Sequence, residues 1–147
     1  MKNMVLLIDA NVILNYLLNR EPFFNNSFRL IDDCRNGKVD AYIAFHTVSI
    51  IWYALRKMPV SERRPILLDI CELMAVVSAS HQKVLQAIME DDFPDFEDCL
   101  QEKCAETVHA DYIVTENKKD FSASKIPAVT SAEMIDILHR SNISNES

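Results

Sequence analysis

The chain has 147 residues, of which 49% are hydrophobic and 25% are charged, and this composition is typical of one globular domain with a sizeable core. Its formal net charge of -7 argues against binding nucleic acid through a broad basic surface, although a bound divalent cation can supply positive charge locally. The four cysteines form no C-x-x-C pair and no secreted disulfide framework, so we expect reduced, mostly buried thiols in a cytoplasmic protein.

The first half of the chain predicts strands that alternate with helices. "MVLLIDA" at 4–10 contains a continuous apolar run, the pattern of a strand buried on both faces, and it leads at Asp9 into helical spacing at 11–18. A helix is expected over 25–36, and "VDAYIAF" at 39–45 predicts a second strand. Asp9 is therefore expected at a junction between a strand and a helix.

The second half continues this alternation. In chain order we expect a helix over 46–57, a helix over 63–74, a short strand over 75–79, a helix over 80–90, a helix over 96–108, a strand that ends at Thr115, a short strand within 126–129, and a last helix capped at Thr130 or Ser131. Strands that alternate with helices of about 10 to 15 residues predict an α/β fold with a parallel sheet covered on both faces.

The chain is predicted to form a single domain over 1–140, followed by a flexible C-terminal tail over 141–147. No segment approaches the roughly 18 uninterrupted apolar residues of a membrane helix, and Asp9 and Asn11 interrupt the first apolar run. We therefore expect no signal peptide and no membrane partner.

The most unusual stretch is "EDDFPDFED" at 90–98, which has six carboxylates in nine positions and no lysine or arginine. Two carboxylates about 4 Å apart repel by roughly 4 kcal/mol at a near-surface effective dielectric of about 20, so this crowding requires a cation or open water. Part of it has a structural explanation, in which Asp95 caps a helix while Glu97 and Asp98 favour its positive end. Capping and metal binding are compatible, so both interpretations stand.

Polar side chains also follow predicted strands at the edge where parallel α/β sheets bind ligands. Asp9 ends the first strand, and Asp98 opens the helix before the fourth strand. Asn117 and Asp120 follow the fourth strand, so we expect all four side chains to converge. A carboxylate that follows an apolar run is costly to bury unless it is paired or coordinated, and Mg²⁺ or Mn²⁺ takes such oxygen ligands.

Three segments in the order "LLIDANVILNYLL", "DFEDCLQEKCA" and "DYIVTENKKDF" resemble the PIN-domain family of metal-dependent ribonucleases, which includes the VapC-type toxins of bacterial toxin-antitoxin pairs. The resemblance covers residues 4 to about 130. It implies a three-layer α/β fold with a parallel sheet of four to five strands between helices, and an acidic pocket for Mg²⁺ or Mn²⁺. It also implies RNA as the substrate and an antitoxin protein as a partner.

The resemblance assigns roles to five residues. By position, Asp9 matches the first metal-binding aspartate and Asp98 matches the aspartate that opens the helix before the fourth strand. Asn117 and Asp120 match the "T-x-N/D-x-x-D-F" segment that closes the pocket, and Asp95 matches an extra acid in relatives that contain "DFED". The implied roles are direct metal ligation for Asp9 and Asp98, ligation through water for Asp120 and Asp95, and hydrogen-bond orientation for Asn117.

One position departs from the family pattern. The family commonly has a glutamate in the helix after the second strand, and Ile50 occupies that position here. Either Asp95, Glu97 or Glu116 replaces the glutamate in space, or the metal site is weakened. The first alternative predicts an active endoribonuclease, and the second predicts a PIN-like binding module without turnover.

Two further interpretations concern other parts of the chain. A haloacid-dehalogenase-type phosphatase also begins with an apolar strand that ends in aspartate, but Asn11 stands where its second aspartate is expected. The pair Phe23 and Phe24, after Pro22, is expected to make a capping contact or to dock a partner helix or the second subunit of a homodimer. The sequence leaves these uses of the pair open.

Overall fold

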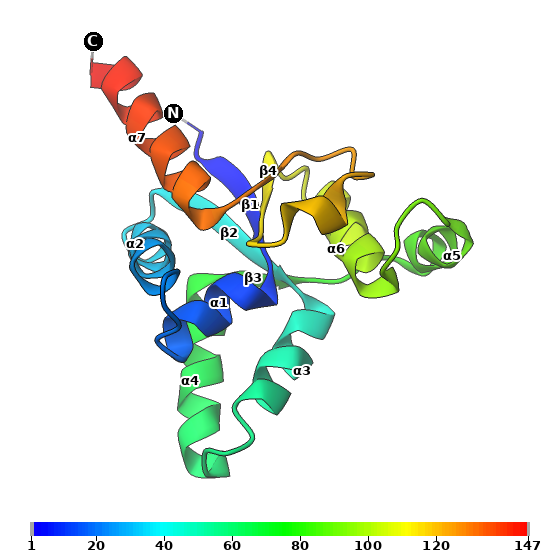
Figure 1. The fold of residues 1–147 in the computed structure, drawn as a ribbon, viewed down its shortest axis with the longest axis horizontal. Helices are drawn as coiled ribbons and strands as arrows, with labels where there is room; N and C mark the ends of the chain where they lie inside the picture. Colours follow the sequence, from blue (N-terminus) through cyan, green and yellow to red (C-terminus); the bar gives the residue numbers. More distant parts are fainter. Residues whose placement is uncertain (1, 147) are drawn as a thin grey trace.

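The computed structural model describes residues 2–146, and side chains up to Ile143. It is an α/β fold with one five-stranded sheet flanked by helices (Figure 1). The strands are β1 (Met4–Ile8), β2 (Val39–Ala44), β3 (Ala75–Val77), β4 (Tyr112–Val114) and β5 (Ala128–Val129). All are parallel in the order β3-β2-β1-β4-β5. The predicted fold class, with its parallel sheet of four to five strands, is confirmed.

Helices connect the strands throughout the described chain. They are α1 (Ala10–Leu17), α2 (Phe24–Arg35), α3 (Phe45–Ala54), α4 (Val60–Leu73), α5 (His81–Met89), α6 (Phe96–Thr107) and α7 (Ser131–Glu146), with a short 3-10 helix, η1 (Lys118–Phe121), after β4. Within the described residues, none of these helices combines the length and the apolarity that a membrane crossing requires.

β1 lies at the centre of the sheet and packs against helices on both faces. Leu6 and Ile8 join one apolar core, which includes side chains of α1, α2, α3, α4 and α7. Leu7, which points to the other face, joins a second core with α5 and α6. A strand covered on both faces has no solvated side, which explains why the run before Asp9 is continuously apolar.

Several predicted helix starts are observed with their capping contacts. Ser80 Oγ accepts a hydrogen bond from the Lys83 N–H (3.2 Å) at the start of α5. At the start of α7, Thr130 Oγ1 accepts from the Glu133 N–H (3.1 Å), while Glu133 Oε1 accepts from the Thr130 N–H (2.9 Å). This reciprocal capping box identifies Thr130, rather than Ser131, as the cap.

Two local features differ from the sequence expectations. Helical spacing predicts that Phe96 faces the core with Cys104, but its side chain is 48% exposed, and the buried residue of the same first turn of α6 is Cys99. α7 is helical as far as Glu146, so the helix includes most of the predicted tail. Ser147 lies outside the described residues.

Candidate active site

Asp9 is held at the carboxyl end of β1 by hydrogen bonds from several elements. Its own N–H donates to the Val114 carbonyl of β4 (2.9 Å), which fixes the junction between the two central strands. Its side chain caps α1 and accepts four hydrogen bonds, from Ala10 N (2.7 Å) and Gln101 Nε2 (3.0 Å) to Oδ1, and from Thr115 Oγ1 (2.8 Å) and Asn11 Nδ2 (3.3 Å) to Oδ2. The orientation of this carboxylate is therefore fixed before any ligand binds.

Gln101 connects three elements at the site and was missed by the sequence analysis. Its side chain is 2% exposed, and Nε2 lies 3.0 Å from Asp9 Oδ1 and 3.4 Å from Thr47 Oγ1 of α3. Its Oε1 atom is buried without a hydrogen-bond partner among the described residues. Gln101 follows Asp98 by three positions, so helical spacing alone places both on neighbouring parts of one α6 face. This spacing from Asp98 is the feature of the sequence that could have identified Gln101 as a site residue.

Thr115 links Asp9 to the segment after β4. Thr115 is fully buried, and its Oγ1 donates to Asp9 while accepting a hydrogen bond from the Asn117 N–H (3.1 Å). The Asp120 N–H in turn donates to the Asn117 carbonyl (3.1 Å). The side chain of Asn117 is exposed and that of Asp120 is half-buried. The segment that follows β4 thus places Asp120 on the same side of the sheet as Asp9.

Asp95 caps α6, as the structural explanation of the acidic stretch predicts. Its Oδ1 accepts hydrogen bonds from the Glu97 N–H (2.8 Å) and the Asp98 N–H (3.2 Å). Asp98 then lies in the first turn of the helix and is only partly exposed. The cap fixes the position of this turn, because both N–H groups bind one carboxylate oxygen.

Burial and neighbouring negative charges raise the pKa of two aspartates at this edge, Asp98 and Asp9. Burial and the negative charges of Asp95, Asp9 and Asp120 raise the pKa of Asp98 to about 7. Burial also raises the pKa of Asp9, against hydrogen bonds from Thr115 and Ala10, and the charge of Asp120 adds to the rise. The structure therefore brings Asp9, Asp98 and Asp120 close enough to repel, with Asp95 beside Asp98.

No cation of the described chain neutralises this group. Among side chains 2–143, no lysine or arginine forms an ion pair with Asp9, Asp95, Asp98 or Asp120, and Lys118 instead binds Glu133 at 3.0 Å. Over the described residues, no three acidic, histidine or cysteine side chains already enclose a point where an ion could sit. The donor chemistry suits a hard cation, and binding would require the Asp98 and Asp120 carboxylates to turn toward the fixed carboxylate of Asp9.

α3 supplies no acid to this group. Ile50 is half-buried one turn after Thr47, whose hydroxyl contacts Gln101. His46 lies at the start of the same helix, close enough to Glu97 and Asp9 for their negative charges to act on its ring. Burial nevertheless keeps the pKa of His46 below its ordinary value. The α3 side of the site therefore offers a hydroxyl group and a neutral imidazole where the family pattern has a carboxylate.

The three predicted replacements for that carboxylate lie in different places. Asp95 and Glu97 are beside Asp98 at the start of α6, where their charges act on it. The Glu116 carboxylate accepts hydrogen bonds from the Ser131 N–H (3.1 Å) and Oγ (2.5 Å) at the start of α7. Glu116 is therefore occupied away from Asp9, and only the α6 acids remain as spatial replacements.

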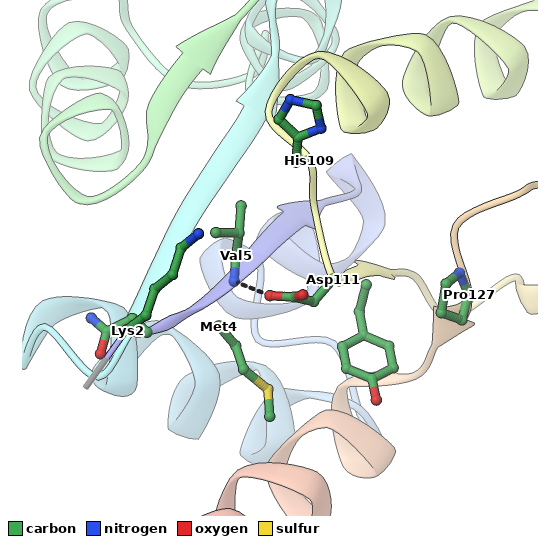
Figure 2. Close-up of a pocket in the computed structure, with 8 residues that line it drawn as sticks. Lys2, Met4, Val5, His109, Asp111 and Pro127 are labelled. Atoms are coloured by element: carbon green, nitrogen blue, oxygen red, sulfur yellow. Dashed lines mark hydrogen bonds between the residues drawn. The ribbon is translucent and has the colours of Figure 1, made fainter.

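A cavity of about 420 Å³ lies at the opposite edge of the sheet (Figure 2). It is lined by Met4 and Val5 at the start of β1 and by His109, Asp111 and Pro127. Asp111 Oδ2 accepts a hydrogen bond from the Val5 N–H at 2.8 Å. This cavity is separated from Asp9 by the length of β1, so it is not part of the acidic site.

A PIN-domain family model matches residues 5–119, which contain β1 to β4 and four of the five predicted site residues. The chain belongs to the PIN-domain family. No curated protein sequence matches it significantly.

Several solved structures have a similar fold. The VapBC-1 structure from nontypeable Haemophilus influenzae matches with a TM-score of 0.66 at 15% identity, over 88% of this chain and 99% of that chain. VapBC2 from Rickettsia felis, bound to a DNA fragment from its promoter, matches with a TM-score of 0.62 at 17% identity, over 86% and 98%. FitAcB from Neisseria gonorrhoeae matches with a TM-score of 0.62 at 15% identity, over 86% of this chain and 98% of that chain. The predicted resemblance to PIN domains and VapC-type proteins is confirmed.

Proposed function

We propose that this PIN-domain protein is an endoribonuclease that depends on Mg²⁺ or Mn²⁺ and acts in the cytoplasm as the toxin of a bacterial toxin-antitoxin pair. The observation that carries the proposal is the group formed by Asp9, Asp98 and Asp120 at the carboxyl edge of the sheet. Crowded carboxylates without a cation are electrostatically costly, and a bound divalent ion removes that cost. Family membership and the VapBC neighbours support the same reaction class.

The residues divide the work of binding and orientation. Asp9 and Asp98 would hold the ion directly, whereas Asp120 and Asp95 would hold it through water. Asn117 would orient a water or a phosphate oxygen with its exposed amide. The bound cation would supply the positive charge that lowers the pKa of a water and polarises a phosphoryl oxygen. Thr115 and Gln101 keep the Asp9 carboxylate in place through their hydrogen bonds.

We propose an antitoxin as the protein partner, since the similar solved structures are described as VapBC assemblies. A homodimer is the second proposed assembly. Phe24 stacks on Tyr16 with ring centroids 6.3 Å apart, so its ring already has an intramolecular contact. Phe23 is 38% exposed and is the member of the aromatic pair that is open to a second protein.

A second candidate function is a PIN-domain binding module without turnover, which the isoleucine at position 50 favours. Calorimetric titration with Mn²⁺ separates the two. The nuclease predicts one saturable site in the wild type that is lost in Asp9→Asn and in Asp98→Asn, followed by cleavage of RNA. Absence of Mn²⁺ binding, or binding that neither variant changes, would select the module.

The role of position 50 can be tested directly. Ile50→Glu adds a carboxylate on the α3 face that carries Thr47, so we expect tighter Mn²⁺ binding and faster RNA cleavage than in the wild type. Ser49→Glu is the matched control because it adds the same charge to the same helix at an exposed neighbouring position. Equal effects of the two substitutions would show that the change arises from net charge alone.

A further inference from the structure

A second, smaller cavity lies at the same sheet edge as the aspartates. Its volume is about 180 Å³, and it lies at the carboxyl ends of β2 and β3, against α5 and α6. Its lining residues are Phe45, His46, Ser78, Ala79, Val84, Leu100 and Cys104. α5 and α6 pack against each other on this side of the sheet (Figure 1). The cavity is thus distinct from the pocket in Figure 2 and from the aspartate group itself.

His46 connects the cavity to the acidic site. It lines the cavity, and its ring also lies close enough to Asp9 for their charges to interact. α6 makes a similar connection, since Leu100 lines the cavity while the adjacent Gln101 binds Asp9. A chain-like substrate with a phosphodiester at the aspartates would therefore have its neighbouring unit next to this cavity.

The lining combines an apolar interior with a polar edge. Val84, Leu100 and Cys104 supply aliphatic and thiol surface. Phe45 contributes a ring that is 68% exposed, although it lies directly after the buried end of β2. On the polar side, His46 and Ser78 line the cavity. A flat ring with apolar faces and polar edge atoms complements this combination.

The size of the cavity restricts its occupant. Pockets for drug-sized ligands measure about 300 to 1,000 Å³, so 180 Å³ suits a single ring system. Proteins that bind single-stranded RNA place unstacked bases on aromatic side chains and pair their edges with polar groups. Phe45 and His46 offer both kinds of contact beside the aspartates.

We infer that this cavity is a nucleobase subsite, which holds one base of the RNA strand whose phosphodiester lies at Asp9 and Asp98. The inference rests on the proposed function, because it takes RNA as the substrate. Phe45 stacks on the base, and the polar lining residues His46 and Ser78 bind its edge. The subsite gives the enzyme a preference for the base at one position next to the cleaved bond.

The first experiment uses uncharged probes so that the acidic site does not repel them. Adenosine, guanosine, cytidine and uridine are titrated into the metal-free protein in EDTA, and binding is followed by protein NMR. We expect at least one nucleoside to bind, and Phe45→Ala to weaken it by about 5-fold or more. Tyr53→Ala is the matched control, since Tyr53 is 66% exposed on the same helix but does not line the cavity.

A second variant blocks the cavity without removing the aromatic ring. Val84→Phe adds bulk from α5, and we expect it to abolish nucleoside binding while the NMR spectrum of the rest of the protein is retained. The subsite is overturned if no nucleoside binds the wild type up to its solubility limit. It is also overturned if Phe45→Ala and Tyr53→Ala have equal effects.

A cleavage experiment distinguishes a base within RNA from a free nucleoside. Short RNAs that vary one base next to the cleaved bond are compared by kcat/KM. We expect the ratio between the best and the worst base to fall about 5-fold or more in Phe45→Ala and to be retained in Tyr53→Ala. Nucleoside binding without any base preference in cleavage overturns the RNA subsite.

Failure of the subsite and failure of the nuclease give different results. Mn²⁺ binding and RNA cleavage without nucleoside binding overturn the subsite alone. Nucleoside binding that Phe45→Ala weakens, in a protein without Mn²⁺ binding or RNA cleavage, overturns the nuclease. In that result the cavity binds bases without an adjacent reaction, so the inference of a subsite for cleavage is overturned with it.

Discussion

α6 carries two crowded groups of carboxylates, and only one of them contains a cation. In the middle of the helix, Lys103 Nζ lies 2.8 Å from Glu90, 3.3 Å from Glu102 and 3.9 Å from Glu106. Lys83 also binds Glu106 at 2.9 Å. Burial opposes ionisation of Glu106, but the two lysines outweigh it and lower the pKa of this carboxyl.

The first turn of α6 has the opposite electrostatic character. Asp95 and Asp98 meet Asp9 and Asp120 there without an ion pair among side chains 2–143, and the pKa of Asp98 rises to about 7. The two groups differ in burial as well, since Glu102 and Lys103 are buried whereas Asp95 is exposed. The middle group is held by lysines of the same chain, whereas the first-turn group has no lysine or arginine partner among the described side chains.

The largest expected effect comes from removing the internal cation. Lys103→Met leaves Glu90 and Glu102 without their lysine, and the buried Glu102 carboxylate cannot be solvated. We expect a loss of about 3 to 5 kcal/mol in the free energy of unfolding, measured by urea denaturation. Lys118→Met is the control, because its ion pair with Glu133 is exposed and worth about 0 to 1 kcal/mol. Equal losses of unfolding free energy in the two variants would contradict the proposed difference between the buried and the exposed lysine.

The first-turn group should respond in the opposite way. Asp98→Asn removes one repelling charge, so we expect the metal-free protein to gain thermal stability at pH 8. The same change removes a proposed ligand, and Mn²⁺ affinity should fall by about 100-fold or more, a larger loss than indirect contacts cause. Asp136→Asn on α7 is a control with an exposed carboxylate. Destabilisation by Asp98→Asn in EDTA would mean that this charge is already compensated.

A smaller effect is expected from the residue that orients Asp9. Gln101→Leu fills the buried position with an apolar side chain of similar size but removes the hydrogen bond to Asp9 Oδ1. We expect calorimetry to give Mn²⁺ affinity about 10- to 100-fold weaker than in the wild type. Gln86→Leu, on the exposed side of α5, should leave the affinity unchanged. Unchanged affinity in Gln101→Leu would show that Thr115 and the backbone suffice to hold Asp9.

The smallest effect is a pH trend in the metal-free protein. The pKa of Asp98 is near 3.8 when unperturbed and about 7 in the folded chain, so the folded state binds this proton more tightly. Its stabilising contribution is therefore complete below about pH 4 and is lost as the pH rises through 7. We expect the melting temperature in EDTA to fall between pH 5 and pH 8, and to fall less in Asp98→Asn. Parallel trends in the two proteins would assign the pH dependence to other groups.

The parts of the molecule that depend on local patterns could be predicted from the sequence. The apolar run before Asp9 predicts β1, and the polar residue at position 95 predicts the cap of α6. Both signals are local, because strand burial leaves a continuous run and a cap needs only its own first turn. The fold class follows from the order of such elements.

The missed features all depend on contacts between distant elements. Gln101 contacts Asp9 across 92 positions, and Glu116 accepts hydrogen bonds from Ser131 at the start of α7, 15 positions away. Phe96 has helical spacing with the buried Cys104 but is 48% exposed, although Cys99 in the same turn is buried. Spacing along the chain predicts which face a residue occupies, but it does not predict how far the opposing layer reaches.

The position of β1 in the sheet has a consequence for synthesis on the ribosome. β1 emerges about 100 residues before β4, yet it pairs with β4 on one side, where Leu6 lies opposite Tyr112. At about 5 to 20 residues per second, roughly 10 s separate the emergence of Asp9 from that of Asp120. Until then β1 and β2 present an unpaired apolar edge, which is a binding site for chaperones. The nascent chain therefore carries an incomplete aspartate group, which is assembled only after β4 and Asp120 have emerged.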